Sequence, residues 1–370
     1  MGMLPREPLT AGPVILRIPE DKDLDPLIRA YADPAVTRFI PFVPEEYGKD
    51  DALAWFAKAQ DAWEGGGAQF VIADAGTGEF LGASLLKPPD RFGNSEIGYM
   101  LARWARGRGV ATAAVRSLTD WGFSHGMPRI ELLTGVENIA SQRVAYRSGY
   151  TREGVLREEY ATLDGVRHDS IAFSRLAGDP SDPIEPFLPF FPGGFPSGSL
   201  TDGVVRLSPL VPGDADDYHA MQSDPESYKY SVPPQAPSYA DSVMRCRHAG
   251  MWWLSGQRVE LAIRRAGTGA FAGHIQLANV VAPLEQAMVG YSLHRDHRGH
   301  GLMTRAVNLL VEWAFEHTAL HRIIAGTALE NTASQRVLER AGFTREFIVK
   351  GLLPRPDGTR VDDLQWARHR

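Results

Sequence analysis

Apolar and polar positions follow both the helical and the strand period along this chain. Apolar residues at helical spacing, Val115, Leu118 and Trp121, predict an amphipathic helix over 111–123. Three other helices are expected, over 26–32, 50–63 and 140–148, and Gly149 is suited to end the last of them in a left-handed conformation. Strands are expected over 69–73, 81–86, 96–101 and 130–136, followed by a final hairpin. The pattern is that of a mixed α and β domain.

The same pattern occurs twice. Three sets of residues recur in the same order at an offset of 192 or 193: Gly98-Tyr99 as Gly290-Tyr291, Arg106–Gly109 as Arg298–Gly301, and Asn138 with Ser141 as Asn331 with Ser334. Such self-similarity is typical of a repeated structural unit. The sequence therefore predicts a tandem duplication of a domain of roughly 175 residues.

A segment rich in proline and phenylalanine separates the two copies. We expect a first domain over 1–178, a linker over 179–203 and a second domain over 204–370. Proline prevents regular structure there. Because exposed aromatic rings are unfavourable in water, the four linker phenylalanines predict that the segment packs on a domain surface: Phe187, Phe190, Phe191 and Phe195.

Composition narrows the class of protein. A chain of 370 residues with a net charge of −6 fits two soluble domains and disfavours a nucleic-acid partner. The one cysteine, Cys246, excludes a disulfide framework and fits a reducing cytoplasm. The chain has no stretch apolar enough to predict a membrane span, and its histidines show no repeated ligand spacing. We expect a cytoplasmic protein without a metal or a membrane partner.

The repeated Arg-Gly-x-Gly turn between a strand and an amphipathic helix is suited to binding phosphate. Glycine lets the backbone turn sharply and lets N–H groups approach an anion, and the start of the helix adds its positive dipole end. Thr112 and Thr304 could donate a hydroxyl. The turn lacks the Gly-Lys-Ser/Thr of a P-loop and the third glycine of a dinucleotide fingerprint.

These residues resemble a known family. Arg106, Gly109 and Ala111, preceded by Gly98-Tyr99 and followed by the Asn138-x-x-Ser141 motif, look like the GNAT superfamily of acyl-CoA-dependent N-acyltransferases, in its RimJ/RimL-like branch. The resemblance covers essentially all of both halves. It implies an α/β fold (an α+β mixed sheet) in two tandem GNAT domains, each sheet splayed between two strands with acetyl-CoA or another acyl-CoA in the splay.

The resemblance also implies where the donor binds. The pyrophosphate is expected on backbone amides 106–111, and the pantetheine arm along the strand edge near Leu101 and Arg103. The expected donor contacts are Leu101, Arg103, Arg106, Gly107, Arg108, Gly109, Val110, Ala111 and Thr112 in the first half, and Leu293, Arg298, Gly299, His300, Gly301, Leu302, Met303, Thr304, Asn331 and Ser334 in the second.

Acylation of an amine requires a base and stabilisation of the leaving thiolate. Glu96, two residues before Gly98, is the candidate base of the first half, and the alternative is a solvent-facing strand glutamate. Its counterpart is Met288, which cannot accept a proton. Three residues are the candidate substitutes in the second half, although each is individually better explained as structural: Glu285, His274 and His294.

Asn138 and Ser141 begin a helix, so simple capping is the alternative to a catalytic role. The resemblance implies that the asparagine orders the CoA arm and that the serine lies near the sulfur. The tyrosine that many GNAT enzymes place seven residues after this asparagine is absent, since Ala145 and Leu338 occupy those positions. Met303 is expected to crowd the second phosphate turn, which together with Met288 predicts that the second half is the weaker catalyst.

Three functions are compatible with these residues. The first is acyl transfer from acyl-CoA to a primary amine: a peptide or protein N-terminus, a small metabolite or an antibiotic. The second uses an acyl carrier protein as donor in natural-product biosynthesis. The third is a non-catalytic acyl-CoA sensor. The duplicated halves predict either a monomer that imitates a dimer or a homodimer.

Overall fold

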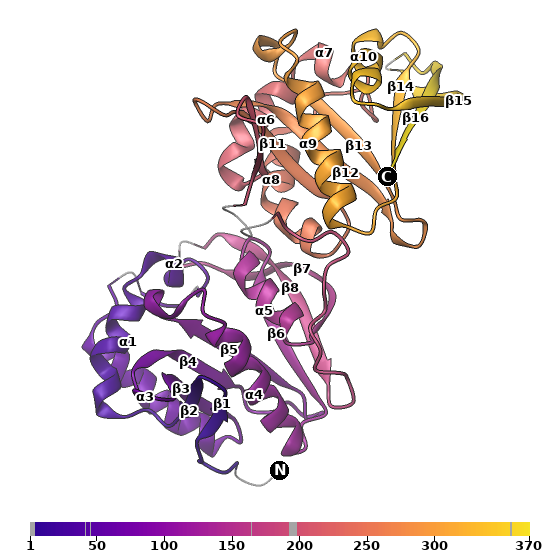
Figure 1. Ribbon diagram of the computed structural model, residues 1–370. Helices are drawn as coiled ribbons and strands as arrows, with labels where there is room; N and C mark the ends of the chain where they lie inside the picture. The colour runs from indigo at the N-terminus through magenta and orange to yellow at the C-terminus, as the bar shows by residue number, and fades with distance from the viewer. Residues whose placement is uncertain (1–3, 41, 45, 164, 192–197, 356) are drawn as a thin grey trace. The chain divides into compact units, whose positions relative to one another are not determined.

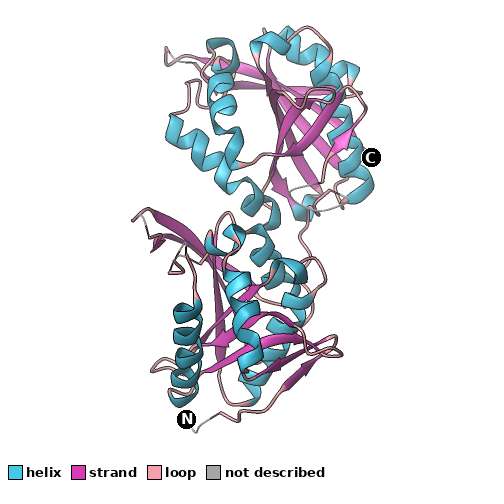
Figure 2. Ribbon diagram, turned by 90° about the vertical axis from the view of Figure 1, so that its left-hand side faces the viewer, coloured by secondary structure: helices cyan, strands magenta, loops and turns pink. Residues whose placement is uncertain are grey.

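The computed structural model of this protein describes residues 4–370 except 41, 45, 164, 192–197 and 356. The chain divides into two compact units, the first ending at Glu185 and the second beginning at Pro186 (Figure 1). Each unit contains one eight-stranded sheet, with helices covering both of its faces (Figure 2). Two mixed-sheet α/β units of one fold confirm the predicted fold class.

The first sheet has the order β1-β2-β3-β4-β5-β6-β8-β7. Its strands are β1 (Leu9–Ala11), β2 (Val14–Arg17), β3 (Ala68–Asp74), β4 (Phe80–Leu86), β5 (Ser95–Leu101), β6 (Arg129–Gly135), β7 (Thr151–Ala161) and β8 (Arg167–Leu176). The pair β5–β6 is parallel, and its neighbours in the sheet are antiparallel. Of these, β1 and β2 were not predicted, because three and four residues are too few to display a period of two.

The helices of the first unit are η1 (Asp21–Asp23), α1 (Leu24–Tyr31), α2 (Pro34–Thr37), α3 (Lys49–Glu64), η2 (Arg103–Ala105), α4 (Val110–Ser124) and α5 (Ile139–Arg147). All predicted helices and strands of this half lie within two residues of the observed bounds. Gly149 has a φ of +77°, which confirms the left-handed end expected after α5. The one-turn helix α2 was missed, because four residues give no helical periodicity.

The second sheet mirrors the first, with the order β15-β16-β14-β13-β12-β11-β10-β9. Its strands are β9 (Leu200–Thr201), β10 (Val205–Pro209), β11 (Val259–Arg265), β12 (Phe271–Val281), β13 (Gln286–Leu293), β14 (Arg322–Ala328), β15 (Thr344–Pro354) and β16 (Arg360–His369). Its helices are η3 (Pro212–Asp214), α6 (Ala215–Gln222), α7 (Pro225–Tyr228), α8 (Tyr239–Leu254), η4 (Ala282–Leu284), η5 (Arg295–His297), α9 (Leu302–His317) and α10 (Thr332–Arg340). The parallel pair is β13–β14.

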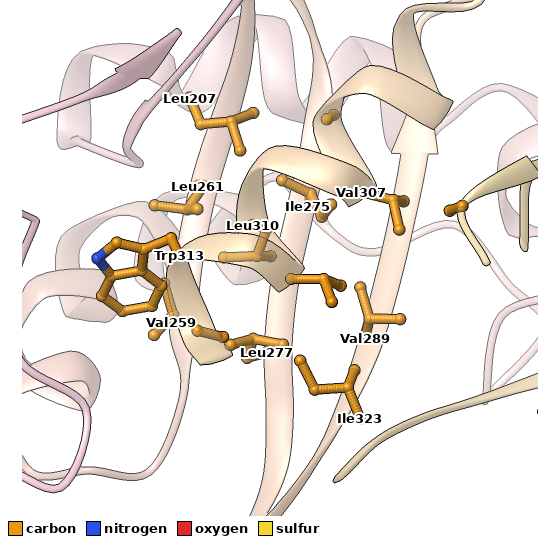
Figure 3. Packing of buried hydrophobic residues seen from close by; sticks show 14 of the residues in the cluster. Leu207, Val259, Leu261, Ile275, Leu277, Val289, Val307, Leu310, Trp313 and Ile323 are labelled. Carbon is orange, nitrogen blue, oxygen red and sulfur yellow. The ribbon is translucent and has the colours of Figure 1, made fainter. Parts of the chain in front are cut away.

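The core of the second unit lies between α9 and the sheet. Val307, Leu310 and Trp313 recur every three residues and therefore lie on one face of α9. They pack against strand residues such as Leu261 and Ile275 (Figure 3). Burial of this apolar face is the main favourable term that holds the helix on the sheet, and so fixes where its N-terminus lies.

The segment between the domains is anchored by packing. Phe190 and Phe191 contact Trp253, and Phe191 also contacts Trp313 edge to face at 5.0 Å between ring centroids. The indole Nε1 of Trp253 donates to the Leu188 carbonyl oxygen at 2.8 Å. These contacts confirm for three of the four phenylalanines, Phe187 included, that they pack on a domain. Phe195 lies outside the described residues.

We expect Phe191→Ala to destabilise the second unit by about 3 kcal/mol, because it leaves a cavity where a side chain only 2% exposed fills the space between two tryptophans. Urea unfolding followed by tryptophan fluorescence measures the effect. Phe347→Ala, at a side chain 55% exposed in the same unit, is the control and should change stability by less than about 0.5 kcal/mol. Equal unfolding midpoints for the two variants would contradict the anchoring role.

Candidate active site and donor-binding turns

The two parallel strands of each sheet separate after a short paired stretch. In the first unit β5 and β6 pair at Ser95 with Ile130 and at Glu96 with Glu131. In the second unit the pairing of β13 and β14 reaches Met288 with Ile324. On their other sides β6 and β14 pair along their whole lengths with β8 and β16. The sheets therefore open after Glu96 and after Met288, as the resemblance implies.

A glutamine holds the separated strand in place in each unit. Gln142 of α5 donates its Nε2 to the Val136 carbonyl oxygen at 2.9 Å. Gln335 of α10 does the same to the Leu329 carbonyl oxygen at 2.9 Å. Because α5 and α10 follow directly after the diverging strands, this bond fixes the helix start beside the opening. This glutamine directly follows Ser141 and Ser334 in the sequence and was not among the predicted site residues.

The two glycine turns have the predicted geometry. Gly107 and Gly109 have φ values of +74° and +76°, and Gly299 and Gly301 have +81° and +71°. A Cβ at any of these four positions would meet no atom within 4 Å, so the turns are open. Gly109 and Gly301 are the residues directly before α4 and α9. The first N–H groups of each helix have no carbonyl partner within the helix and are of the kind that binds an anion.

The arginines of these turns have a structural task. Arg106 donates to the Leu101 carbonyl oxygen at 3.3 Å and forms an ion pair with Asp33 at 2.8 Å. Arg298 likewise donates to the Leu293 carbonyl oxygen at 3.1 Å and pairs with Asp224 at 2.9 Å. Both aspartates also cap the one-turn helices α2 and α7 through backbone N–H groups. The arginines thus connect the turn to the end of the strand before it.

The other predicted donor residues occupy three kinds of environment. Val110, Ala111, Leu302 and Met303 are buried in the first turns of α4 and α9. Half-buried residues are Thr112, Thr304, Leu101 and Leu293, and exposed residues are Arg103, Gly107, Arg108, Gly109, Gly299, His300 and Gly301. The expectation that Met303 crowds its turn is wrong. Its side chain is 5% exposed and belongs to the hydrophobic core of the second unit, because the helical period turns it inward.

Glu96 lies at the last paired position before the strands diverge. It is half-buried, and its Oε2 lies 2.8 Å from Nζ of Lys87. Its neighbour Glu131 is held by Arg129, with 2.9 Å between Nη2 and Oε1. Because Ile97 points into the core, Glu96 points to the other face, toward the side covered by α1 and α3.

The corresponding pair in the second unit is apolar, Met288 beside Ile324. The three candidate substitutes lie elsewhere. Glu285 ends η4, His294 precedes η5 and lies 3.4 Å from Asp296, and His274 is buried against Glu260. None of the three occupies the position that Glu96 has in the first unit.

A hydroxyl pair beyond the divergence was missed by sequence analysis. The Tyr99 hydroxyl donates to Ser141 Oγ at 2.9 Å, and in the second unit the Tyr291 and Ser334 oxygens are 2.8 Å apart. Burial raises the pKa of Tyr99 well above its usual range and that of Tyr291 to about 12, so both phenols stay protonated. The Gly-Tyr dipeptide recurring at an offset of 192 was the available signal.

Asn138 and Asn331 cap the helices that carry these serines. Asn138 Oδ1 accepts from the Ser141 backbone N–H at 3.1 Å, and Asn331 Oδ1 from that of Ser334 at 3.2 Å. The capping alternative is therefore present in both units. By capping α5 and α10, the asparagines orient the two serine hydroxyls.

Two other features bear on the chemistry. Burial raises the pKa of the Cys246 thiol to about 12, which makes it a poor nucleophile. Within the described part of the chain, no three His, Cys, Asp or Glu side chains gather in a way that could hold a metal ion. No helix described there is both long and apolar enough to cross a membrane.

Comparison with known proteins returns one family twice. The family described as "Acetyltransferase (GNAT) domain" matches residues 14–151 and again residues 205–344. The "Probable N-acetyltransferase YjcK" of Bacillus subtilis is 39% identical over 95 residues, which are 25% of this chain and 52% of that protein. The "Uncharacterized N-acetyltransferase p20" of Bacillus licheniformis is 32% identical over 176 residues, which are 46% of this chain and 96% of that protein.

Among solved structures, Mycobacterium smegmatis RimJ in complex with CoA-disulfide is similar at 27% identity and a TM-score of 0.42. The match covers 49% of this chain and 90% of RimJ.

Proposed function

Because both halves of this chain belong to the GNAT acetyltransferase family, we propose that the protein transfers an acyl group from acyl-CoA to a primary amine. The first half is the proposed catalyst. The observation that carries this assignment is the position of Glu96 at the last paired residue before β5 and β6 diverge. We propose that a carboxylate at this position reaches the opening in which the amine and the thioester would meet.

The donor is proposed to bind through the backbone of the glycine turn. Arg106 and Arg108 already have partners in Asp33 and Asp74, which lie 2.8 and 3.7 Å away. The N–H groups at the start of α4 are therefore the better candidates for the pyrophosphate. Acetyl-CoA is the donor we propose first, since the family is named for acetyl transfer.

The chemical step balances with this chain's residues. The amine nitrogen attacks the thioester carbonyl carbon and gives a proton to the Glu96 carboxylate; the carbon–sulfur bond then breaks, and CoA leaves as its thiolate. Ser141 accepts a hydrogen bond from Tyr99, so its own proton is free to point toward the sulfur. A hydrogen bond to the developing thiolate lowers the barrier because it strengthens as the charge forms.

We propose two acceptor classes for the first half, a peptide or protein N-terminus and a small amine. The relatives' names specify acetyl transfer to nitrogen without an acceptor. The full chain mixed with acetyl-CoA and a panel of amines should release CoA in step with N-acetyl product for at least one class. The panel contains peptides with free N-termini, polyamines and aminoglycosides.

Three results would redirect this proposal. Binding of acetyl-CoA without product from any amine would favour the sensor. Transfer that requires an acyl carrier protein would favour the carrier-dependent enzyme. No binding of any acyl-CoA would overturn the donor assignment.

A further inference from the structure

A group of charged and polar side chains around the His274–Glu260 pair lies in the second unit. We call it the polar cluster: Arg245, Arg258, Glu260, His274 and Gln276. Glu260 is at its centre, with a fully buried side chain. Its Oε1 lies 2.8 Å from Nη1 of Arg245 and 3.1 Å from Nη1 of Arg258, and its Oε2 lies 2.5 Å from Nε2 of His274.

The fold does not need these charges, as the first unit demonstrates. Gly82 and Gly273 occupy equivalent positions, because a Cβ on either would contact the leucine that ends the next strand. This equivalence aligns β4 with β12. The 16-residue helices α3 and α8 align in the same way. At the positions of the polar cluster the first unit carries Trp55, Gly67, Gln69, Ala83 and Leu85. Ala83 and Trp55 there belong to an apolar cluster.

The polar cluster extends to the strand that lines the opening. Arg245 Nη1 lies 3.4 Å from Oε1 of Gln276, and Gln276 is the cross-strand partner of Gly290. A Cβ at Gly290 would lie 2.9 Å from Gln276 Nε2, so the glutamine side chain covers this glycine. Met288, the counterpart of Glu96, lies two residues away and on the same face. The polar cluster therefore occupies the side on which the first unit presents Glu96.

The polar cluster carries more positive than negative charge. Two guanidinium groups and an imidazole surround one carboxylate. Although burial by itself raises the pKa of Glu260, His274 and the two arginines hold that pKa below its usual value, so the carboxylate stays ionised. A guanidinium has five N–H donors, and about three tenths of each arginine side chain remains exposed. Glu260 thus holds in place two cations that can bind a further anion.

We propose that the second unit binds an acceptor amine that also carries an anionic group, a carboxylate or a phosphate, and that Arg245 and Arg258 recognise this group. Burying a carboxylate among charges is a poor way to gain stability, and an apolar alternative exists in the sister unit, so the charges point to recognition. The inference rests on the proposed function, because it takes the face of Met288 and Gly290 as the acceptor side. It gives the two units different acceptor chemistry.

Calorimetric titration of the full chain with two pairs of amines tests this. L-Alanine with L-alaninamide isolates a carboxylate, and phosphoethanolamine with ethanolamine isolates a phosphate. In at least one pair, we expect the member that carries the carboxylate or phosphate to bind at one site per chain and at least about tenfold more tightly than the member that lacks this group. The pair that shows the difference identifies which anion the site takes.

Variants locate the site. Arg258→Gln should remove the preference for the member with the anionic group and leave the affinity for the member without it unchanged. Arg258→Lys should keep part of the preference. Lys58→Gln, at an exposed position of α3 in the other unit, removes the same charge and should change nothing. Thermal unfolding of each variant establishes that it is folded.

Equal binding of both members in both pairs, or a preference that survives Arg258→Gln, would overturn the proposal. Acetyl-CoA binding is measured on the same preparation. A chain that binds acetyl-CoA but makes no distinction within either pair contradicts this inference alone. A chain that binds no acyl-CoA contradicts the proposed function instead.

Discussion

Replacing Glu96 by glutamine is expected to lower the rate of acetyl transfer at least about 100-fold, the usual contribution of a positioned general base. The amide keeps the size and most of the hydrogen bonding of the carboxylate but cannot accept the proton of the amine. Affinity for acetyl-CoA should be nearly unchanged, because the proposed contacts to its pyrophosphate lie on the glycine turn and Glu96 is proposed to act on the amine. Turnover and calorimetric titration on the same protein measure both quantities.

Glu131 provides the matched control. It is the cross-strand partner of Glu96, but Arg129 binds its carboxylate through both Nε and Nη2. Glu131→Gln should therefore retain most of the turnover. If Glu131→Gln abolished transfer and Glu96→Gln did not, Glu131 would be the base and the assignment of Glu96 would be wrong. If both variants transferred at the original rate, the reaction would use neither.

Replacing Gly109 by tryptophan is expected to weaken acetyl-CoA binding to the first unit by about 100-fold or more, the value of about two charge-assisted hydrogen bonds. The glycine has a φ of +76° and open space where a Cβ would lie, so an indole there would cover the N–H groups at the start of α4. Calorimetric stoichiometry before and after the change counts the sites. If the unchanged chain binds two acetyl-CoA molecules, Gly109→Trp should bind one; if the unchanged chain binds one, Gly109→Trp should bind none.

Two further variants separate occlusion from strain. Gly109→Ala carries the same penalty for a left-handed residue, about 1–2 kcal/mol, without covering the turn, and should bind acetyl-CoA nearly normally. Gly301→Trp makes the equivalent change in the second unit. Removal of a site by Gly301→Trp would show that the second unit also binds donor, which its core-buried Met303 permits. Unchanged binding in Gly109→Trp would exclude this turn as the phosphate site.

Local periodicity was enough to predict most of the fold. The helix over 111–123 and the strand over 96–101 were placed within one residue of α4 and β5, because the burial of one face imposes a period that survives in the sequence. The internal repeat contributed as much, since residues that recur at a fixed offset must serve the same place in two copies. Elements of four residues or fewer, such as β1, β2 and α2, carry no such period and were missed.

Side-chain direction was predicted less well than element position. The Met303 side chain was expected to crowd the donor turn, yet the helical period of α9 turns it into the core. Arg106 stays a predicted donor contact, and the structure adds an ion pair with Asp33, which lies 73 positions earlier in the chain. Asp33 is far from Arg106 in the chain, so this ion pair could not be inferred from the neighbouring residues.

The sequence by itself determined the duplication, the mixed α/β fold, the family and the glycine turns. Each motif consists of residues close together in the chain, and the duplication follows from the recurrence of these motifs at a fixed offset. The tertiary structure alone decided that Tyr99 meets Ser141 and that Arg245, Glu260 and His274 form one cluster. The residues in contact are 14 to 42 positions apart, and only the pairing of strands and the docking of helices bring them within hydrogen-bonding distance. Contacts of this kind depend on sheet register and helix orientation, which no local pattern encodes.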